Sequence, residues 1–172
     1  DFDSESATGL LFDVGYWTDH AVHKFAGYTG STQPVDPDDI SYVDDLCMDT
    51  SHARRFLHTF TSMYRAKGVT GQTWPSDTDM ERLANQYAYG IFNKDFDELL
   101  ATNYWDGTNG WFWNLSSYYA KPYSLGSKSA CTGGYGFYNT YNADVSQINN
   151  AQYNMILTSN TRACCTIIFE SN

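Results

Sequence analysis

The residues best suited to catalysis or metal binding in this sequence are its four histidines. They all lie in the first third of the chain: His20, His23, His52 and His58. His20 and His23 are three positions apart, a spacing that brings two imidazoles onto one helical turn, where they could bind a metal or exchange protons. An exposed polar turn explains the same pattern equally simply. We favour that interpretation and predict no metal site.

A second group of candidate catalytic residues consists of three acidic side chains: Asp95, Asp97 and Glu98. Glycoside hydrolysis needs two carboxylates across a cleft, roughly 5 to 9.5 Å apart. Glu98 with Asp95 or Asp97 could therefore be the acid and base of a small secreted hydrolase acting on polysaccharide, which is our alternative hypothesis. On one helical turn Glu98 and Asp95 would lie side by side, which counts against it. No nucleophile elbow, P-loop or HExxH motif is present, so we expect no enzyme and no cofactor.

The elements that would position such residues are clearest between Phe56 and Ala88, where the pattern predicts two amphipathic helices. Thr50 or Ser51 can cap the first helix, and Gly68 and Gly71 are predicted to end it. Its apolar side chains recur on a 3.6-residue period at Phe56, Leu57, Phe60, Met63 and Tyr64.

The second helix is predicted to start at Ser76 and Asp79, which have capping-box spacing. Trp74, just before this cap, is placed to pack over the helix pair. The predicted buried stripe of the second helix consists of Met80, Leu83, Ala84, Tyr87, Ala88 and Ile91.

Residues 56–88 resemble the N-terminal part of a CAP-superfamily domain. This superfamily groups cysteine-rich secretory, antigen 5 and pathogenesis-related class one proteins. Its usual sequence pattern in this part is FLDxHNxxRxxxGVPPLxWxxxLxxxAQxYA. Arg65, Gly68 and Trp74 stand at compatible spacing. Residues 110–123 are similar to the family's SWYxExxxYNYxNP segment, and residues 149–165 to its GHYTQVVWxxTxxVGC signature.

The resemblance implies an α+β fold, a three-layer α-β-α sandwich around a small antiparallel sheet. It also implies a cavity that typical members line with two His and two Glu. Here His58, Glu98 and Asn114 are the remnant of that cavity, and no histidine follows His58. The metal-binding tetrad is therefore expected to be absent.

Other segments carry weaker patterns. Residues 1–45 are predicted to form a partly irregular N-terminal extension, and residues 46–172 the CAP-like domain. We expect a short helical piece within residues 92–110, a long loop over residues 124–144, and strands beyond Asn149.

Composition and charge limit the class of protein. The 172 residues suit one compact domain, and a net charge of -10 argues against nucleic acid as a partner, because a polyanion would be repelled. No run of 18 apolar residues exists, so no transmembrane segment is expected. The sequence begins without Met and without an apolar leader, as expected of a processed secretory product.

The four cysteines also favour secretion and an extracellular location: Cys47, Cys131, Cys164 and Cys165. They lack the CxxC spacing of a zinc site, so we predict disulfides, with the connectivity left open. Asn114-Leu115-Ser116 is an N-glycosylation sequon, which predicts a glycoprotein if the source is eukaryotic.

Aromatic residues, 17% of the chain, suggest the function. Five cluster in one segment and form the predicted contact surface: Trp111, Trp113, Tyr118, Tyr119 and Tyr123. Such side chains combine a large apolar area with a polar group, which suits recognition of carbohydrates, lipids or proteins. We therefore expect a secreted, non-enzymatic protein that binds a protein receptor or a small lipid or sterol through this surface.

Overall fold

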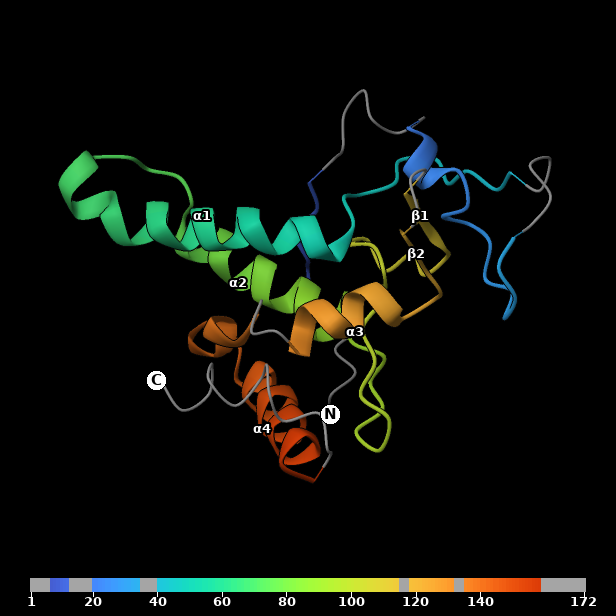
Figure 1. Ribbon diagram of the computed structural model, residues 1–172. Coiled ribbons are helices and arrows are strands. Elements are labelled where there is room, and N and C mark those ends of the chain that lie inside the picture. The colour runs from blue at the N-terminus through green and yellow to red at the C-terminus, as the bar shows by residue number, and fades with distance from the viewer. Residues whose placement is uncertain (1–6, 13–19, 35–39, 115–117, 132–134, 159–172) are drawn as a thin grey trace.

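The computed structural model describes residues 7–12, 20–34, 40–114, 118–131 and 135–158, apart from the side chains of Trp113, Asn114, Tyr118, Cys131, Ile156 and Thr158. Within these residues the chain is mainly helical. Figure 1 shows α1 lying along α2, with α3 below them, α4 at the opposite end from α1, and a short β-hairpin to one side.

Helix α1 (Thr50–Thr70) is the longest described element, and it has a capping residue at each end. Asp49 is its N-cap, and its carboxylate accepts from the backbone N–H groups of Ser51 and His52. The predicted caps Thr50 and Ser51 are wrong by one or two residues, because both are already helical. Gly71, with φ of 71°, ends the helix as predicted, whereas Gly68 lies inside it.

Helix α2 (Asp77–Asn85) begins with the predicted capping box. The Ser76 hydroxyl accepts from the Asp79 N–H, and the Asp79 side chain accepts from the Ser76 N–H. The helix continues into a π-helical turn, η3 (Gln86–Ile91), and all six residues of the predicted stripe are buried: Met80, Leu83, Ala84, Tyr87, Ala88 and Ile91.

The face that α1 buries differs from the predicted one. Ala53 and Leu57 are fully buried, but Phe56 is 44% exposed. Phe56 and Phe60 instead form an aromatic cluster with Phe12 of the N-terminal segment, with ring centroids 5.9 to 6.4 Å apart. Trp74 packs edge-on against Phe60 at 4.8 Å, as its position ahead of the α2 cap predicted.

The expected three-layer sandwich is wrong. The described residues contain one two-stranded antiparallel sheet, β1 (Phe112–Asn114) and β2 (Tyr118–Ala120), which pairs Phe112 with Ala120. Three residues per strand provide too little apolar surface for helices to cover on two faces. The fold is therefore a helical assembly with a small hairpin at its edge.

The segments after β2 are helices where loops and strands were expected. They are α3 (Ser124–Cys131), the 3₁₀ helix η4 (Gly136–Thr140) and α4 (Ala143–Thr158). Val145, Ile148 and Gln152 of α4 are all buried, and their spacing is helical, so α4 packs one face on the core. The helical piece expected within residues 92–110 is not formed, and the expected strand TIIFE lies outside the described residues.

Part of the N-terminal region packs on this core. The 3₁₀ helix η2 (Ala21–His23) is followed by Phe25 and Ala26, which are fully buried. Residues 7–12 run beside α1 and α2, where Leu10 N–H donates to Arg82 O and the Trp105 indole donates to Leu10 O.

Candidate functional site

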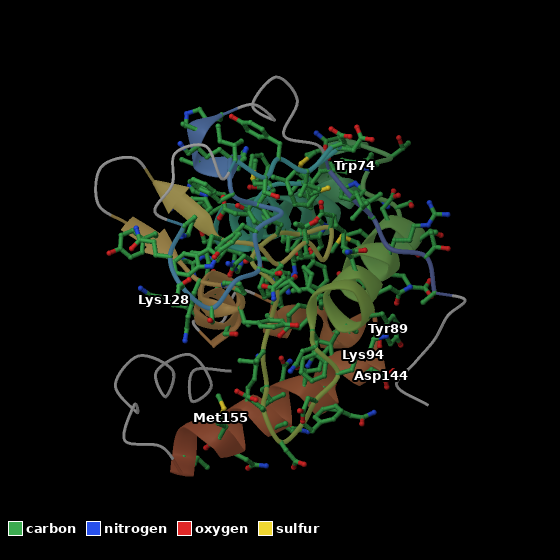
Figure 2. All side chains as sticks on the ribbon, turned by 90° about the vertical axis from the view of Figure 1, so that its right-hand side faces the viewer. Trp74, Tyr89, Lys94, Lys128, Asp144 and Met155 are labelled. Atoms are coloured by element: carbon green, nitrogen blue, oxygen red, sulfur yellow. The ribbon has the colours of Figure 1, made fainter. Side chains whose placement is uncertain are left out.

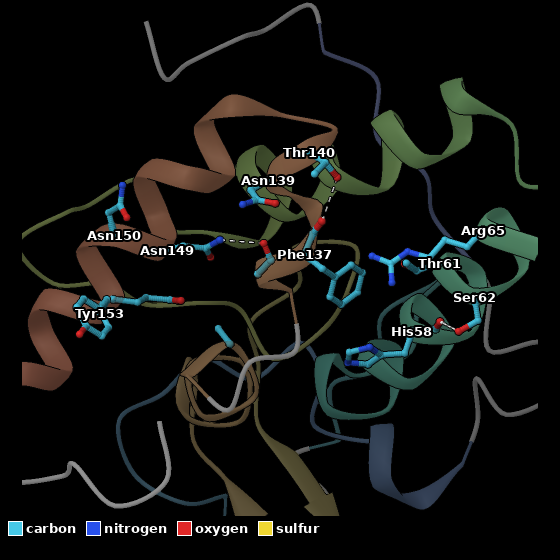
Figure 3. Close-up of a pocket in the computed structure, with 13 residues that line it drawn as sticks. His58, Thr61, Ser62, Arg65, Phe137, Asn139, Thr140, Asn149, Asn150 and Tyr153 are labelled. Carbon is cyan, nitrogen blue, oxygen red and sulfur yellow. Dashed lines mark hydrogen bonds between the residues drawn. The ribbon is translucent and has the colours of Figure 1, made fainter. Parts of the chain in front are cut away.

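A pocket of about 810 Å³ lies between α1, η4 and α4 (Figure 3). This volume is within the range of small-molecule sites, roughly 300 to 1,000 Å³. We call it the α1–α4 pocket. Its lining consists of His58, Thr61, Ser62 and Arg65 from α1, Ala130 from α3, Gly136, Phe137, Asn139 and Thr140 from η4, and Asn149, Asn150, Gln152 and Tyr153 from α4.

The α1 wall is a polar stripe. His58, Thr61, Ser62 and Arg65 stand at i, i+3, i+4 and i+7, so one helix face presents all four. The hydroxyls of Thr61 and Ser62 donate to the carbonyls one turn earlier, at 3.0 Å each, which fixes their orientation. Their oxygens can still accept hydrogen bonds from a ligand.

The η4 wall is an aromatic ring with amide and hydroxyl groups beside it. The Phe137 ring lies 4.7 Å from the His58 ring, centroid to centroid, at an interplanar angle of 41°. The Thr140 hydroxyl donates to the Phe137 carbonyl at 3.3 Å, a bond drawn in Figure 3. The ring contact joins η4 to α1, whereas the Thr140 hydrogen bond lies within η4.

The α4 wall is anchored by two amides. Asn149 Nδ2 donates to the Gly136 carbonyl at 3.0 Å, which joins α4 to η4 (Figure 3). Buried Gln152 donates to the Tyr87 hydroxyl at 3.2 Å, which joins α4 to the core. Tyr89 Oη further donates to Asp144 at 2.7 Å, and Figure 2 shows these two residues close together.

Four lining side chains from three elements leave their polar groups available. His58, Arg65, Asn139 and Asn150 form no side-chain hydrogen bond or ion pair with any other residue that the structure describes. Burial lowers the pKa of His58, and the Arg54 charge lowers that pKa further, so the imidazole is neutral at neutral pH and can donate and accept. Among the described residues that line the pocket, none is Asp or Glu.

A second pocket, of about 550 Å³, lies beside α2 and residues 7–8. Several of its polar groups already bind one another. Asn142 Nδ2 donates to Asn85 Oδ1 at 2.8 Å and to Tyr89 Oη at 3.2 Å. The Asn85 amide donates to the Thr8 carbonyl at 3.3 Å. These hydrogen bonds occupy part of the polar lining of the second pocket, and that lining also contains the carboxylate of Glu81.

The predicted aromatic surface does not form around Trp111. This residue is only 6% exposed, and its indole donates to the Gly30 carbonyl at 2.7 Å. Tyr119 is 49% exposed and lies 6.3 Å from Trp111, while Tyr123 is half-buried with φ of 65°. The side chains of Trp113 and Tyr118 lie outside the described residues.

The predicted cavity remnant is not brought together. His58 lines the α1–α4 pocket, whereas Glu98 lies in an exposed loop and lines neither pocket. The backbone of Asn114 is in β1, and its side chain is outside the described residues.

The proposed carboxylate pair of a hydrolase shares the loop of Glu98. Asp95 Oδ1 accepts from the backbone N–H groups of Asp97 and Glu98, at 2.8 and 3.2 Å, so this carboxylate shapes a turn. All three acidic side chains are exposed, and none of them lines either of the two pockets described above.

The cysteine prediction stays a prediction. Cys47 is buried, and its backbone N–H donates to Asp106 Oδ2 at 3.0 Å. Cys131 is the last residue of α3, but its side chain is outside the described part of the chain, as are Cys164 and Cys165 entirely.

The histidines His20 and His23 are used structurally. His20 Nδ1 accepts from the Val22 N–H at 3.3 Å and caps η2, and His23 is 5% exposed. In the described part of the chain, no three His, Cys, Asp or Glu side chains converge as metal ligands. None of the helices described there has the length and apolarity needed to cross a bilayer.

Sequence reasoning did not identify Asn139, Asn149, Asn150 or Tyr153 as site residues. The signal for half of the site was present in α1, where the polar residues His58, Thr61, Ser62 and Arg65 follow helical spacing. The other half depended on recognising α4, a segment whose apolar residues were interpreted as a strand.

Comparison of the chain with known protein families, characterised proteins and solved structures found no match. The resemblance to the CAP superfamily therefore stays a sequence-based prediction, and the sandwich it implied is overturned by the helical fold.

Proposed function

We propose that the chain is a binding protein without catalytic activity that takes a hydroxyl-rich ligand, a carbohydrate, in the α1–α4 pocket. The observation that carries this proposal is the unused hydrogen-bonding capacity of His58, Arg65, Asn139 and Asn150 around one pocket. Amide and imidazole groups can donate and accept at once, as a sugar hydroxyl also does.

The aromatic rings in the lining support the same class of ligand. Phe137 and Tyr153 lie among polar side chains, so the pocket combines flat apolar surfaces with hydrogen-bonding groups. A sugar ring has apolar C–H faces and polar edges, which matches this combination. A sterol would leave the amides of the pocket unpaired when it displaced their water, at a cost of about 1–3 kcal/mol for each buried group.

Binding is favoured over hydrolysis because the lining residues that the structure describes include no carboxylate. Hydrolysis of a glycosidic bond through paired carboxylates needs two of them at the bound sugar. The acidic loop of Asp95, Asp97 and Glu98 is outside the pocket lining.

A glycan array followed by isothermal titration calorimetry on the glycans it retains would test the proposal. We expect Asn150→Ala to weaken binding about tenfold, because it removes both hydrogen-bonding functions of one amide. Asn154→Ala is the matched control, because Asn154 is exposed on the same helix but does not line the pocket.

Circular dichroism of both variants should show the wild-type helix content. Absence of any bound glycan, or equal weakening by Asn150→Ala and Asn154→Ala, would refute the proposal.

A further inference from the structure

The charge at the α1–α4 pocket is opposite to the charge of the whole protein. The chain has 10 Lys and Arg against 20 Asp and Glu. Helix α1 nevertheless carries four of those ten cations and no Asp or Glu: Arg54, Arg55, Arg65 and Lys67. One of the four, Arg65, lines the pocket, and Figure 3 shows its side chain extending from α1 toward η4.

No acidic side chain satisfies this guanidinium within the described part of the protein. Arg65 forms no ion pair or hydrogen bond there, and no Asp or Glu occurs among the described residues of the pocket lining. A guanidinium presents five donors in a planar fork that matches the two oxygens of a carboxylate or sulfate. In a protein of net charge -10, an unpaired Arg in a pocket creates a local site where an anion is favoured.

We infer that the ligand of the α1–α4 pocket is an acidic saccharide whose carboxylate or sulfate binds the guanidinium of Arg65. This inference rests on the proposed carbohydrate-binding function and specifies the ligand further. The hydroxyls of Thr61 and Ser62, one turn before Arg65 on the same face, are positioned to contact the same end of the ligand. The amides of Asn139 and Asn150 are available to the sugar hydroxyls.

The test compares an acidic oligosaccharide with its neutral ester and with a second acidic oligosaccharide. An oligogalacturonide and its fully methyl-esterified form share the same rings and length, but only the first has free carboxylates. A sulfated galactan oligosaccharide of equal length is the third ligand, and it distinguishes sulfate from carboxylate as the preferred oxyanion. Dissociation constants would be measured by isothermal titration calorimetry at low salt, where exposed charges are least screened.

Matched variants assign the effect to Arg65. Arg65→Gln removes the charge and keeps a side chain that can hydrogen-bond, while Arg65→Lys keeps the charge but not the planar fork. Arg55→Gln is the control, because Arg55 is exposed on the same helix and does not line the pocket. It changes the net charge of the protein by the same amount as Arg65→Gln.

We expect the wild-type protein to bind one of the acidic ligands at least tenfold more tightly than the methyl ester. Arg65→Gln should remove this preference, Arg65→Lys should keep part of it, and Arg55→Gln should keep all of it. Equal affinities of the wild-type protein for the acidic and esterified ligands would overturn the inference and leave the carbohydrate function standing. A preference that survives Arg65→Gln would also overturn it, and failure of the array to retain any glycan would overturn both proposals.

Discussion

The imidazole of His58 packs against the ring of Phe137 at 4.7 Å, and this contact joins α1 to η4 across 79 positions of sequence. Both residues line the α1–α4 pocket. The Phe137 ring is therefore part of the environment of this histidine, and a first prediction follows from that environment.

Phe137→Ala should raise the pKa of His58 toward its ordinary value of 6.5. Burial is the main cause that lowers this pKa, and removal of the neighbouring ring admits water to the imidazole. An NMR titration of the imidazole C–H signals would measure the change. Phe96→Ala is the control, since Phe96 packs on Phe92 and does not line the pocket. An unchanged His58 pKa in Phe137→Ala would contradict the assigned cause.

Two buried tyrosines should respond differently to loss of their hydroxyls. Tyr135 Oη donates to the Thr50 carbonyl at 2.6 Å, whereas Tyr138 Oη is buried without a hydrogen-bond partner in the described residues. Tyr135→Phe should lower the free energy of unfolding by about 0.5–1.5 kcal/mol, because it removes a buried hydrogen bond. Tyr138→Phe should leave the free energy of unfolding unchanged or raise it, because it removes a buried hydroxyl that has no partner among the described residues.

Urea denaturation of the two variants, with the wild-type protein measured in parallel, checks this prediction. Both substitutions remove one oxygen from a buried ring, so each controls for the other. A destabilisation by Tyr138→Phe as large as that by Tyr135→Phe would show that the Tyr138 hydroxyl has a partner.

Asn103 should be among the most sensitive positions of the fold. It is fully buried, and its amide nitrogen donates to the carbonyls of Gly110 and Lys121 at 2.9 Å each. Its oxygen accepts from the N–H groups of Leu125 and Gly126, at 2.9 and 3.3 Å. One side chain thus ties the loop before β1, the end of β2 and the start of α3 together.

Asn103→Asp should destabilise the protein by about 3 kcal/mol or more, because a carboxylate cannot donate to the two carbonyls and its charge would be buried. Thermal and urea unfolding would measure the loss. Asn139→Asp, at an exposed position, should change stability by no more than about 0.5 kcal/mol. Comparable losses in the two variants would argue against the role assigned to Asn103.

Two helical glycines should give opposite results when replaced by alanine. A Cβ on Gly126 would collide with the backbone carbonyl oxygens of Ala101 and Thr102, so Gly126→Ala should cost about 1–3 kcal/mol. A Cβ on Gly68 would meet no atom within 4 Å, and Gly68→Ala should add about 0.5–1 kcal/mol of stability through helix propensity. Chemical denaturation measures both, and a loss for Gly68→Ala would contradict this account of α1.

The start of α1 should be most stable over a limited range of pH. Asp49 Oδ2 lies 2.7 Å from His52 Nδ1. Burial alone would raise the pKa of Asp49, but hydrogen bonds from His52 and Ser51 together lower it below 3.8. The hydrogen bond to Asp49 raises the pKa of His52 above 6.5, and burial opposes this change.

The directions of the two pKa shifts define the pH range in which this pair stabilises the protein. The Asp49 contribution is present above pH 3.8 and is lost as pH falls through the lowered pKa. The His52 contribution is present below pH 6.5 and is lost as pH rises through the raised pKa. The stability difference between wild type and His52→Ala should therefore be largest between these pH values. Urea denaturation from pH 3 to pH 9 would measure it, and a difference that grows above pH 6.5 would refute the assignment. Because His52 is half exposed, solvent reduces the size of the effect.

Some features of the two helices could be predicted from nearby residues alone. The capping box and buried stripe of α2 and the end of α1 at Gly71 were predicted correctly, because each depends on residues within one or two turns. The face of α1 was predicted less well. Phe56 and Leu57 look equivalent in the sequence, but Phe12 covers the aromatic side and the core takes Leu57.

The segment that became α4 shows where such patterns fail. The apolar run Met155, Ile156 and Leu157 suggested a strand, yet the chain there is helical. Val145 and Ile148, about three and two turns before Met155, bury the face that fixes the helix on the core. A short apolar run has no period of its own, so the neighbouring element decides its conformation.

By itself, the sequence determined the two helices between Thr50 and Asn85, the end of the first at Gly71, the capping box of the second and the acidic charge of the chain. Only the tertiary structure decided that His58 and Arg65 face Asn139 and Asn150 across a pocket. The physical reason is distance along the chain. Periodicity specifies which residues share a helix face, but contacts between α1 and the η4–α4 region depend on how the core between them packs.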